Sequence, residues 1–524
     1  MNTSFKLACL GAGLLGMQAN CPADAKAKVA EKPNVLIFIA DDSSFPYASA
    51  YGTNWLKTPG FDRVAEEGIL FNNGFTPNAK SAPSRACLLT GQYSWQLEDI
   101  GNHCAIWPEG RFITVMEHLS ANGYLSAYTG KGWGPGRTVP ADRPLTGASY
   151  HQLKVKAPAK YMSSEDYAGN FEQFLDQKEK GKPWIFWCGT REPHRPYEYE
   201  AGKNYGGLNP DDVNDVPAYL PDNNTVRTDF TDYAFEIQYL DSHLVKILDI
   251  LEDKGELDNT LIIVTADNGM PFPRCKGNQY HTATHLPLAM MWRDGIKNPG
   301  RAENDYVSFV DIVPTILKIS GVEAGEEMHP SGREMTDIFK DKKNKDRTWI
   351  SLGQERHDCG RPGNQSYPIR SIIDGEFMYI NNMKSYLWPV CNPETGYLNT
   401  DGSPTKTEIL EFRRNDVDNH YWQLSFGKRP AEELYNIVDD PDCMVNLAEL
   451  PKYKKMMAQM KKKLYDYLIK TGDPRMGDDG DVFDRYRFHK PENWNFYERY
   501  MNGEIKGHIT NWCNPSDYEK ELLD

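Results

Sequence analysis

The chain predicts an α/β fold, in which helices flank a central and mostly parallel sheet, followed by a smaller C-terminal α+β subdomain. Three short apolar runs, at residues 34–40, 184–188 and 261–265, have the composition of strands that are buried on both faces. Helical patterns lie between these runs, and strands that alternate with helices favour a parallel sheet. With 524 residues the chain exceeds one typical core, so a large domain with a smaller one is expected.

The helices are predicted from apolar residues at helical spacing. Such patterns occur at residues 171–178, 231–254 and 309–319, and a short strand is expected at 124–128. The longest helix places its apolar side chains on one face: Phe235, Tyr239, Leu244, Ile247, Leu248 and Leu251.

The C-terminal part follows a charged segment at residues 340–347, which we interpret as a solvated linker. Short strand-like pieces come next, at 369–373 and 377–380, and a helix is expected from about 452 to 470. The predicted parts of the chain are therefore an export signal at 1–24, a catalytic domain at 32–340 and a C-terminal subdomain with a long aromatic-rich tail at 348–524.

The first 24 residues have the pattern of an export signal. Lys6 supplies a positive start, and the apolar run at 7–17 is too short to span a bilayer. Cys21 is a candidate for lipid attachment, but Asn20 before it fits a lipobox poorly, so cleavage to a soluble form is an equal alternative. We expect a periplasmic or secreted protein without a transmembrane segment.

The formal net charge of −15 argues against a general binder of nucleic acid or anionic membranes. It does not exclude an anionic substrate, because a local group of cations can hold one inside an acidic protein. The ten cysteines show no paired metal-ligand spacing, so a zinc site built from thiolates is not expected. Disulfide pairing stays open.

The most informative segment is Ser-Ala-Pro-Ser-Arg-Ala-Cys-Leu-Leu-Thr-Gly at residues 81–91. It predicts a tight turn that leads into a helix, where backbone N–H groups and the helix dipole favour an anion. A turn that only caps a helix is the alternative. The order Ser-x-Pro-Ser-Arg followed by Leu-Thr-Gly resembles the signature of the type I sulfatases.

This resemblance implies an alkaline-phosphatase-like sandwich and an unusual nucleophile. In that family the leading Cys or Ser is oxidised to formylglycine (3-oxoalanine), whose hydrate attacks sulfur. Because position 81 is Ser, the resemblance is to the Ser-type branch, and it implies an anaerobic-type sulfatase-maturing enzyme of the radical-SAM class as a partner of this chain.

Polar oxygens follow two of the predicted strands. Asp41 and Asp42 end the first strand, and Asp267 and Asn268 end the strand at 261–265. Each pair alone is common in turns. All-oxygen ligands favour Ca²⁺, or less strongly Mg²⁺, over Zn²⁺. The sulfatase resemblance implies that these four residues hold Ca²⁺ together with the modified Ser81.

The resemblance also implies roles for four cationic or basic residues. Arg85, one helical turn after Ser81, would stabilise the nucleophile and the carboxylates. Lys131, in a Gly-rich turn, would contact the sulfate. His194, in Glu-Pro-His-Arg-Pro, would protonate the leaving group. Lys276 would bridge the sulfate and the leaving oxygen.

Two points in this assignment depart from the family pattern or stay open. Many relatives carry a His two residues after the Lys of the Gly-Lys motif, and this chain has Trp133, which leaves the general base unassigned. Arg274 competes with Lys276 for its role, and Lys276 is favoured by position.

Segments 267–280 and 367–371 resemble the sulfamidase (N-sulfoglucosamine sulfohydrolase) branch, and 433–448 resembles a recurrent C-terminal sulfatase segment. Polar and cationic groups in the C-terminal part are candidates for recognising the sugar, although structural hydrogen bonding is an equal alternative for each. These candidates are Glu355, Arg356, His357, Arg361 and Arg370.

The function predicted is an exported sulfatase that removes ester or sulfamate groups from a sulfated glycan, with a glucosamine-type sugar favoured. One alternative is a phosphoesterase or phosphonate hydrolase of the alkaline-phosphatase superfamily. The other is a sulfoglycan-binding protein in which Ser81 stays unmodified.

Overall fold

An eight-stranded mixed sheet forms the centre of the computed structural model, which describes residues 32–505 and 512–523. Strand β1 lies in its middle and pairs in parallel with β9 on one side and β8 on the other. Only β10 runs antiparallel to its neighbours, β9 and β2. In spatial order the strands are β11 (Arg301–Glu303), β2 (Ile69–Phe71), β10 (Leu288–Met291), β9 (Thr260–Ala266), β1 (Asn34–Ala40), β8 (Trp184–Gly189), β5 (Leu125–Gly130) and β7 (Ala148–Ser149).

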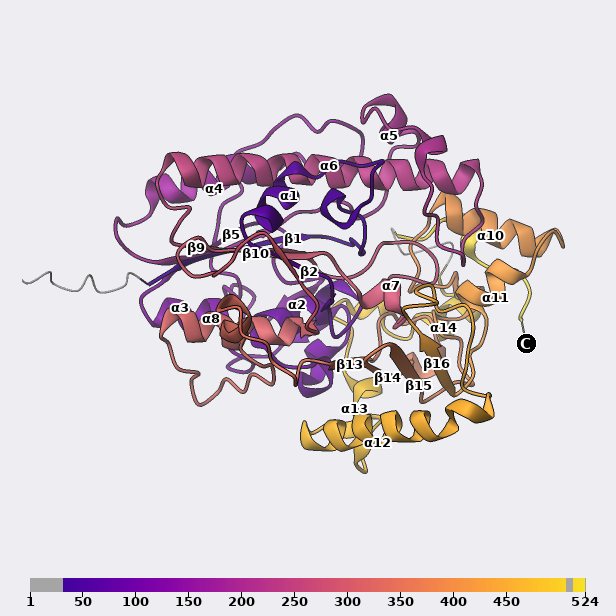
Figure 1. The fold of residues 1–524 in the computed structure, drawn as a ribbon. Helices are drawn as coiled ribbons and strands as arrows, with labels where there is room; N and C mark the ends of the chain where they lie inside the picture. Colours follow the sequence, from indigo (N-terminus) through magenta and orange to yellow (C-terminus); the bar gives the residue numbers. More distant parts are fainter. Residues whose placement is uncertain (1–31, 506–511, 524) are drawn as a thin grey trace, which may run out of the picture. The chain divides into compact units, whose positions relative to one another are not determined.

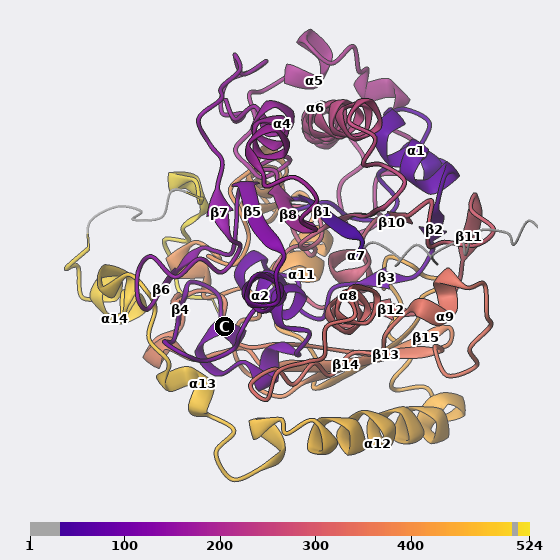
Figure 2. The same cartoon turned by 90° about the vertical axis from the view of Figure 1, so that its left-hand side faces the viewer.

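Helices cover both faces of this sheet (Figures 1 and 2). The helices α1 (Pro59–Glu66), α4 (Tyr167–Gln177) and α6 (Asn224–Asp253) lie on one face. The helices α2 (Ser81–Thr90), α3 (Val115–Ala121) and α8 (Ile312–Ser320) lie on the other. All seven residues of β1 are buried, as a strand between two helical layers must be. The predicted α/β sandwich is confirmed.

A second, four-stranded antiparallel sheet follows in the chain. Its strands are β13 (Trp349–Gln354), β14 (Ile369–Asp374), β15 (Phe377–Asn382) and β16 (Glu432–Asn436), in that spatial order. Helix α12 (Lys454–Lys470) packs on β14 and β15. Helices α10 (Pro404–Arg414) and α11 (His420–Phe426) pack together, and α10 also contacts α6. The second sheet therefore begins directly after the charged segment 340–347, and the division into domains at that segment stays a prediction.

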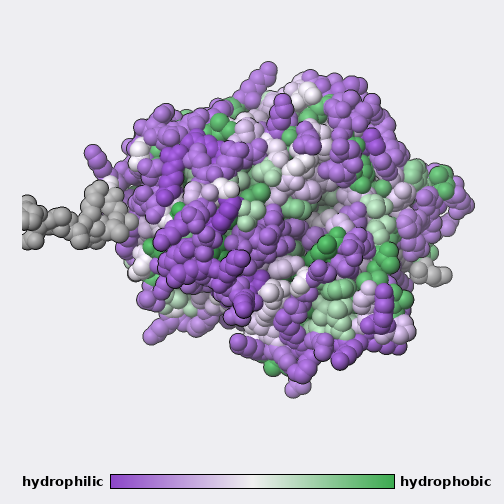
Figure 3. All heavy atoms as spheres, viewed as in Figure 1, coloured by the Kyte–Doolittle hydropathy of each residue, from purple (hydrophilic) through white to green (hydrophobic). Residues whose placement is uncertain are grey.

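The predicted elements differ from the structure mainly at their ends. Helix α6 begins seven residues before the predicted start, because the side chain of Asn223 caps it by accepting a hydrogen bond from the Val226 N–H. The predicted signal at 1–24, with Cys21, lies outside the described residues. Within the described part of the chain, no helix is long and apolar enough to cross a membrane. The face in Figure 3 is largely hydrophilic, which agrees with burial of the apolar strands and helix faces.

Candidate active site

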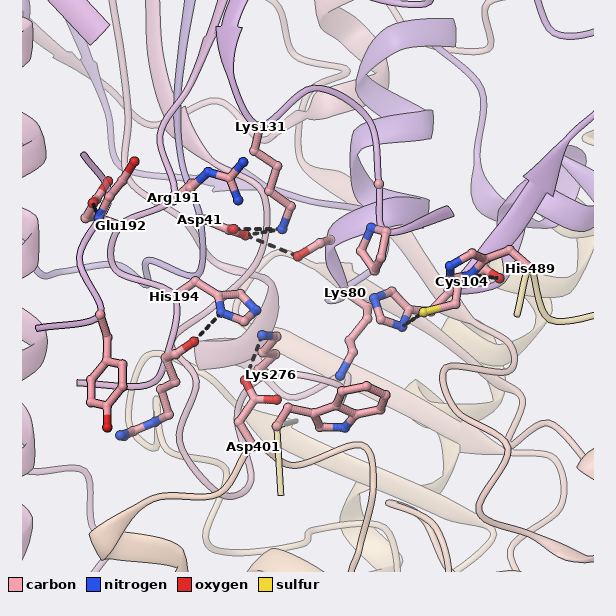
Figure 4. A pocket seen from close by; sticks show the side chains of 18 of the residues that line it. Asp41, Lys80, Cys104, Lys131, Arg191, Glu192, His194, Lys276, Asp401 and His489 are labelled. Atoms are coloured by element: carbon pink, nitrogen blue, oxygen red, sulfur yellow. Dashed lines mark hydrogen bonds and ion pairs between the residues drawn. The ribbon is translucent and has the colours of Figure 1, made fainter. Parts of the chain in front are cut away.

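The carboxyl ends of β1, β5, β8 and β9 meet at one edge of the main sheet, beside a cavity of about 480 Å³. Parallel strands place their carboxyl ends together, and ligands in such sheets bind just beyond them. Asp41, Lys131 and His194, each from a loop after a different strand, line this cavity with Ser81 and Lys276 (Figure 4).

Ser81 is the first residue of α2 and is almost fully buried. Its Oγ lies 3.2 Å from Asp41 Oδ1 and 3.3 Å from Asn268 Oδ1. Helix α2 begins here because Lys80 has an extended backbone, after which Ser81, Ala82 and Pro83 form the first turn. The hydroxyl group therefore lies at a helix N-terminus and faces oxygen ligands from two different strands.

Three carboxylates converge beneath the cavity. Oxygen atoms of Asp41, Asp42 and Asp267 all lie within 4.8 Å of one another, and all three residues are buried. Asn268 Nδ2 donates to Asp42 Oδ1 at 2.8 Å, which leaves Asn268 Oδ1 facing Ser81. Asp42 has a φ of 78°, a left-handed conformation that is uncommon for residues other than glycine. These carboxylate oxygens lie close enough together to act as ligands of one hard divalent cation, so the cluster can hold a metal ion.

Arg85 and Lys131 neutralise this acidic cluster from one side. Arg85 Nε donates to Asp267 Oδ2 at 2.8 Å, and its Nη1 donates to the backbone carbonyls of Lys131 and Gly132. Lys131 Nζ donates to both carboxylate oxygens of Asp41, at 2.8 and 2.7 Å. Burial opposes ionisation of Asp41, but the charges of Lys131 and its other cationic neighbours hold its pKa well below the ordinary value. The structure places Arg85 and Lys131 beside the carboxylates, and the expected contact of Lys131 with the sulfate stays a prediction.

Lys276 neutralises the cluster from the other side. Its Nζ donates to Asp42 Oδ2 at 2.6 Å and to Asp401 Oδ2 at 2.8 Å. Arg274, the competing candidate, instead donates to the backbone carbonyls of Leu424 and Cys443, away from the carboxylates. The structure therefore brings Lys276 to the site and leaves Arg274 in the protein core.

His194 lies on the open side of the cavity, with about one third of its side chain exposed. Its Nδ1 lies 2.7 Å from the backbone carbonyl oxygen of Arg195, a contact that requires Nδ1 to carry the proton in the neutral ring. Its Nε2 lies 3.9 Å from Asp42 Oδ2. The orientation directs Nε2 toward the cluster, where it can exchange a proton with a bound ligand.

Trp133 does not enter this cavity, although it follows Lys131 by two residues. Its indole Nε1 donates to the backbone carbonyl of Ala82 at 3.0 Å, and its ring packs edge-on against Trp107. The imidazole that lines the cavity near Lys80 is His103, whose pKa burial lowers to about 4 although Asp358 acts in the opposite direction. No sequence motif pointed to His103.

The C-terminal candidates lie elsewhere. Arg370 is fully buried, and its guanidinium donates to Asp473 at 2.6 Å and to Glu355 at 2.6 Å. Glu355 also accepts a hydrogen bond from Arg475 at 2.7 Å. These charges satisfy one another inside the C-terminal part of the chain, and neither Glu355 nor Arg370 lines the cavity.

His357, Arg356 and Arg361 are also buried and held by protein groups. His357 Nε2 lies 3.2 Å from Asn78 Oδ1. Arg361 donates to the backbone carbonyls of two consecutive residues, Trp388 and Pro389, and Arg356 donates to those of residues 483 and 484. Their long polar side chains thus fasten segments together, and none of them lines the cavity.

Several residues that the sequence did not indicate do line the cavity. Asp401 comes from a loop before α10 that carries no recognisable motif, and Lys80 directly precedes Ser81. Lys80 Nζ donates to the backbone carbonyl of Asn399 and lies 3.7 Å from Asp358. The other such residues include Tyr161, Arg191, Glu236, His489, Lys490 and Trp512.

Comparisons with known proteins agree with this geometry. A sequence model of the family described as Sulfatase matches residues 33–322, more than half of the chain. An ulvan-active sulfatase of Formosa agariphila is 27% identical over 500 residues, which cover 85% of this chain and 76% of that protein. Human N-sulphoglucosamine sulphohydrolase is 26% identical over 481 residues, which cover 84% of this chain and 91% of that protein.

A solved structure, described as a complex with its substrate D-glucosamine-2-N,6-O-disulfate, superposes with a TM-score of 0.58. The sequence identity is 20%, and the match covers 86% of this chain and 99% of that one, so the likeness concerns the fold. The residues matched by the family model include Ser81, Lys131 and the three carboxylates of the acidic cluster. The chain therefore belongs to the sulfatase family of sulfuric ester hydrolases, and it resembles the sulfamidase branch of that family.

Proposed function

We propose that this protein is an exported, calcium-dependent sulfatase that acts on a sulfated glycan through a formylglycine made from Ser81. One observation carries the proposal: the Ser81 hydroxyl lies between Asp41 and Asn268, on the edge of a buried cluster of three carboxylates and beside three cations. An ordinary structural serine at a helix N-terminus has no need of such surroundings.

A modified residue at position 81 explains how one side chain can both accept and release sulfate. With two hydroxyl groups on Cβ, one hydroxyl loses its proton and its oxygen forms the bond to sulfur while the bond from sulfur to the sugar oxygen or nitrogen breaks. The second hydroxyl then gives its proton to water, the Cβ–O bond to sulfate breaks, and sulfate leaves. Water adds to the resulting aldehyde and restores the two hydroxyl groups. A serine has a single hydroxyl and would stay sulfated, which is why the proposal requires oxidation.

The neighbouring side chains supply the charges and protons for these steps. Lys131 and Lys276 place ammonium groups where the sulfuryl oxygens gain negative charge. As the imidazolium, with Nδ1–H still bound to the Arg195 carbonyl, His194 gives its Nε2 proton to the leaving atom of the sugar. Arg85 is buried beneath Ser81 and holds Asp267 and the Lys131 loop in place.

Asp41, Asp42, Asp267 and Asn268 would hold the calcium ion. Calcium is favoured over zinc because every donor is oxygen, from carboxylates and an amide. When bound, the ion supplies positive charge that stabilises an anionic nucleophile and a sulfate oxygen.

A glucosamine-type sugar is the proposed substrate unit. The support is the similarity to human N-sulphoglucosamine sulphohydrolase and the sulfamidase-like segments at 267–280 and 367–371. Export is supported by the signal-like first 24 residues. The similarity to an ulvan-active sulfatase makes ulvan-type glycans the second class to screen.

The test uses protein co-expressed with an anaerobic-type maturing enzyme. We expect the peptide that contains Ser81 to weigh about two mass units less than the unmodified peptide, because oxidation to the aldehyde removes two hydrogen atoms. We expect turnover of sulfated glucosamine by this protein and none by Ser81→Ala. Ser242→Ala, which alters an exposed serine on α6, is the matched control.

Three outcomes would contradict the proposal. Turnover by Ser81→Ala equal to that of the wild type would show that residue 81 does not supply the nucleophile. Phosphate-ester hydrolysis far above sulfate-ester hydrolysis would favour the phosphoesterase alternative. Glycan binding without turnover, despite confirmed formylglycine, would favour a binding protein.

A further inference from the structure

A second hollow adjoins the active cavity. It measures about 610 Å³, and Lys131 and Arg191 line both spaces. Its other walls come from the Gly-rich turn after β5, from β6 (Gly136–Thr138) and from the loop that leads to β7. We call this hollow the adjoining groove. Lys131 and Arg191 therefore lie between the active cavity and this groove.

The adjoining groove carries an excess of positive charge. Its cationic lining residues are Lys131, Arg137, Arg143 and Arg191, and its one acidic lining residue is Asp142. Lys131 is paired with Asp41, and Arg143 is paired with Glu117. The other two cations of the groove, Arg137 and Arg191, have no such carboxylate partner among the described residues.

Arg137 and Arg191 are exposed, and their guanidinium groups have no ion pair or hydrogen bond with any described residue. Figure 4 shows Arg191 beside Lys131 at the rim of the active cavity. Arg137 lies near the same rim, because its charge contributes to lowering the pKa of His489, after the larger effects of burial and of Lys490. Two free guanidinium groups thus flank one path that starts at the active cavity.

Trp133 adds an aromatic surface to the same groove. Its indole N–H is already used by the Ala82 carbonyl, and its half-buried ring lines the adjoining groove instead of the active cavity. Aromatic rings offer sugars a flat apolar face. The residue that departs from the family pattern after the Gly-Lys motif therefore belongs to the groove.

We infer that the adjoining groove binds the continuation of an anionic glycan whose sulfated sugar occupies the active cavity. Arg191 at the junction and Arg137 beyond it contact carboxylate or sulfate groups of the neighbouring sugars, and Trp133 packs against a sugar ring. Guanidinium groups suit this role because they bind planar and tetrahedral oxyanions through two hydrogen bonds. The inference rests on the proposed function for the identity of the ligand, and it makes this protein selective for oligosaccharides.

Binding tests the inference without any turnover. The unmatured protein, which keeps Ser81 as serine, is titrated calorimetrically with an N-sulfated heparan-type tetrasaccharide and with glucosamine N-sulfate. We expect the tetrasaccharide to bind at least about tenfold more tightly, since each charge-assisted contact contributes on that order. The double variant Arg137→Gln/Arg191→Gln removes this difference. Equal affinities in the wild type, or a difference that survives in the double variant, would overturn the inference.

Kinetics on the matured protein provide the second measurement. The ratio of kcat/KM for the tetrasaccharide to kcat/KM for the monosaccharide should fall about tenfold or more in the double variant. Arg227→Gln, which removes the same charge from a partly exposed arginine outside the groove, should leave the ratio unchanged. An unchanged ratio in the double variant contradicts glycan binding in the adjoining groove. Absence of all sulfate release contradicts the proposed function, and the calorimetric titration then tests binding in the groove by itself.

Discussion

Two buried clusters of charge in this protein have opposite characters. At the carboxyl edge of the main sheet, Asp41, Asp42 and Asp267 crowd together beneath an open cavity. In the C-terminal part, Arg370 lies between Glu355 and Asp473 with no access to that cavity. Both clusters contain arginine and carboxylates, and in both the guanidinium nitrogens and carboxylate oxygens lie at ordinary ion-pair distances. Burial of charge alone therefore does not identify a functional site.

The difference lies in what the charges face. In the C-terminal cluster opposite charges alternate, and every carboxylate contacts a guanidinium group. In the active cluster like charges adjoin, so Asp41 and Asp267 contribute to raising the pKa of Asp42, although burial is the main cause. Arg85, Lys131 and Lys276 offset part of this repulsion, and the cavity gives a metal cation and an anionic substrate access to the cluster. Variants in the two clusters should therefore separate activity from stability.

The largest effect is expected for Asp41→Asn. The change removes a carboxylate that contacts both Ser81 and Lys131, so we expect kcat/KM of the matured protein to fall by about 10³-fold. It should also abolish stabilisation by calcium, which for the wild type at one hundred times Kd amounts to about 2.7 kcal/mol. Calcium-dependent thermal denaturation after chelation measures this.

The control for this prediction is Asp222→Asn, which removes an exposed carboxylate paired with Arg227. It should retain both activity and the calcium response. A wild-type melting temperature that does not respond to added calcium would show that the acidic cluster does not hold this ion.

Arg370→Met should have the opposite result. It leaves Glu355 and Asp473 buried with less compensating charge, which destabilises a protein by about 3–5 kcal/mol. The urea midpoint measures the loss, and kcat/KM per folded molecule should stay close to the wild-type value. Arg227→Met, at an exposed ion pair, should change the midpoint little. A large fall in kcat/KM with unchanged stability would restore Arg370 as a substrate-binding residue.

Lys131→Met should reduce kcat/KM by about 10²-fold, because one donor to the developing charge on sulfate is lost. The backbone carbonyl that binds Arg85 remains, so the loop should keep its place. Lys154→Met, which alters a lysine paired with Glu165 outside the cavity, is the matched control. Equal turnover by Lys131→Met and the control would show that Lys131 takes no part in the reaction.

The sequence could predict the parts of the site that follow from strand order and from motifs. Strands 34–40 and 261–265 are continuous apolar runs, so the polar pairs after them had to meet at one edge of a parallel sheet. The position of Arg85 one turn after Ser81 follows from helix geometry alone.

The C-terminal candidates could not be predicted in the same way. Whether Arg370 faces a ligand or Asp473 depends on a contact between residues more than one hundred positions apart. Asp401 was missed for the same reason, because its loop carries no periodicity or motif and reaches Lys276 only through tertiary packing. The strands β2 and β11, with three residues each, are too short to show a pattern.

The smallest effect is expected at Asp401, where a variant also distinguishes most sharply between the active cluster and the C-terminal cluster. It resembles the C-terminal carboxylates because it is buried and paired, and it resembles the active cluster because it lines the cavity. If Asp401 positions Lys276, Asp401→Asn keeps a hydrogen bond to the ammonium group but removes the charge that centres it between two carboxylates. We expect kcat to fall about tenfold with little change in KM, because the Lys276 contact matters most in the transition state.

The kinetic split distinguishes this role from a structural one. A purely structural Asp401 would lower the urea midpoint and leave kcat per folded molecule unchanged, whereas a direct sugar contact would raise KM. Asp401→Glu retains the charge on a longer side chain and should recover part of kcat. Asn399, two residues earlier, provides a control, because its backbone carbonyl binds Lys80 and its side chain contacts the thiol of Cys391. Asn399→Ala should therefore lower the urea midpoint and leave kcat per folded molecule nearly unchanged. If Asp401→Asn instead lowers kcat and leaves the urea midpoint nearly unchanged, that carboxylate belongs to the active cluster.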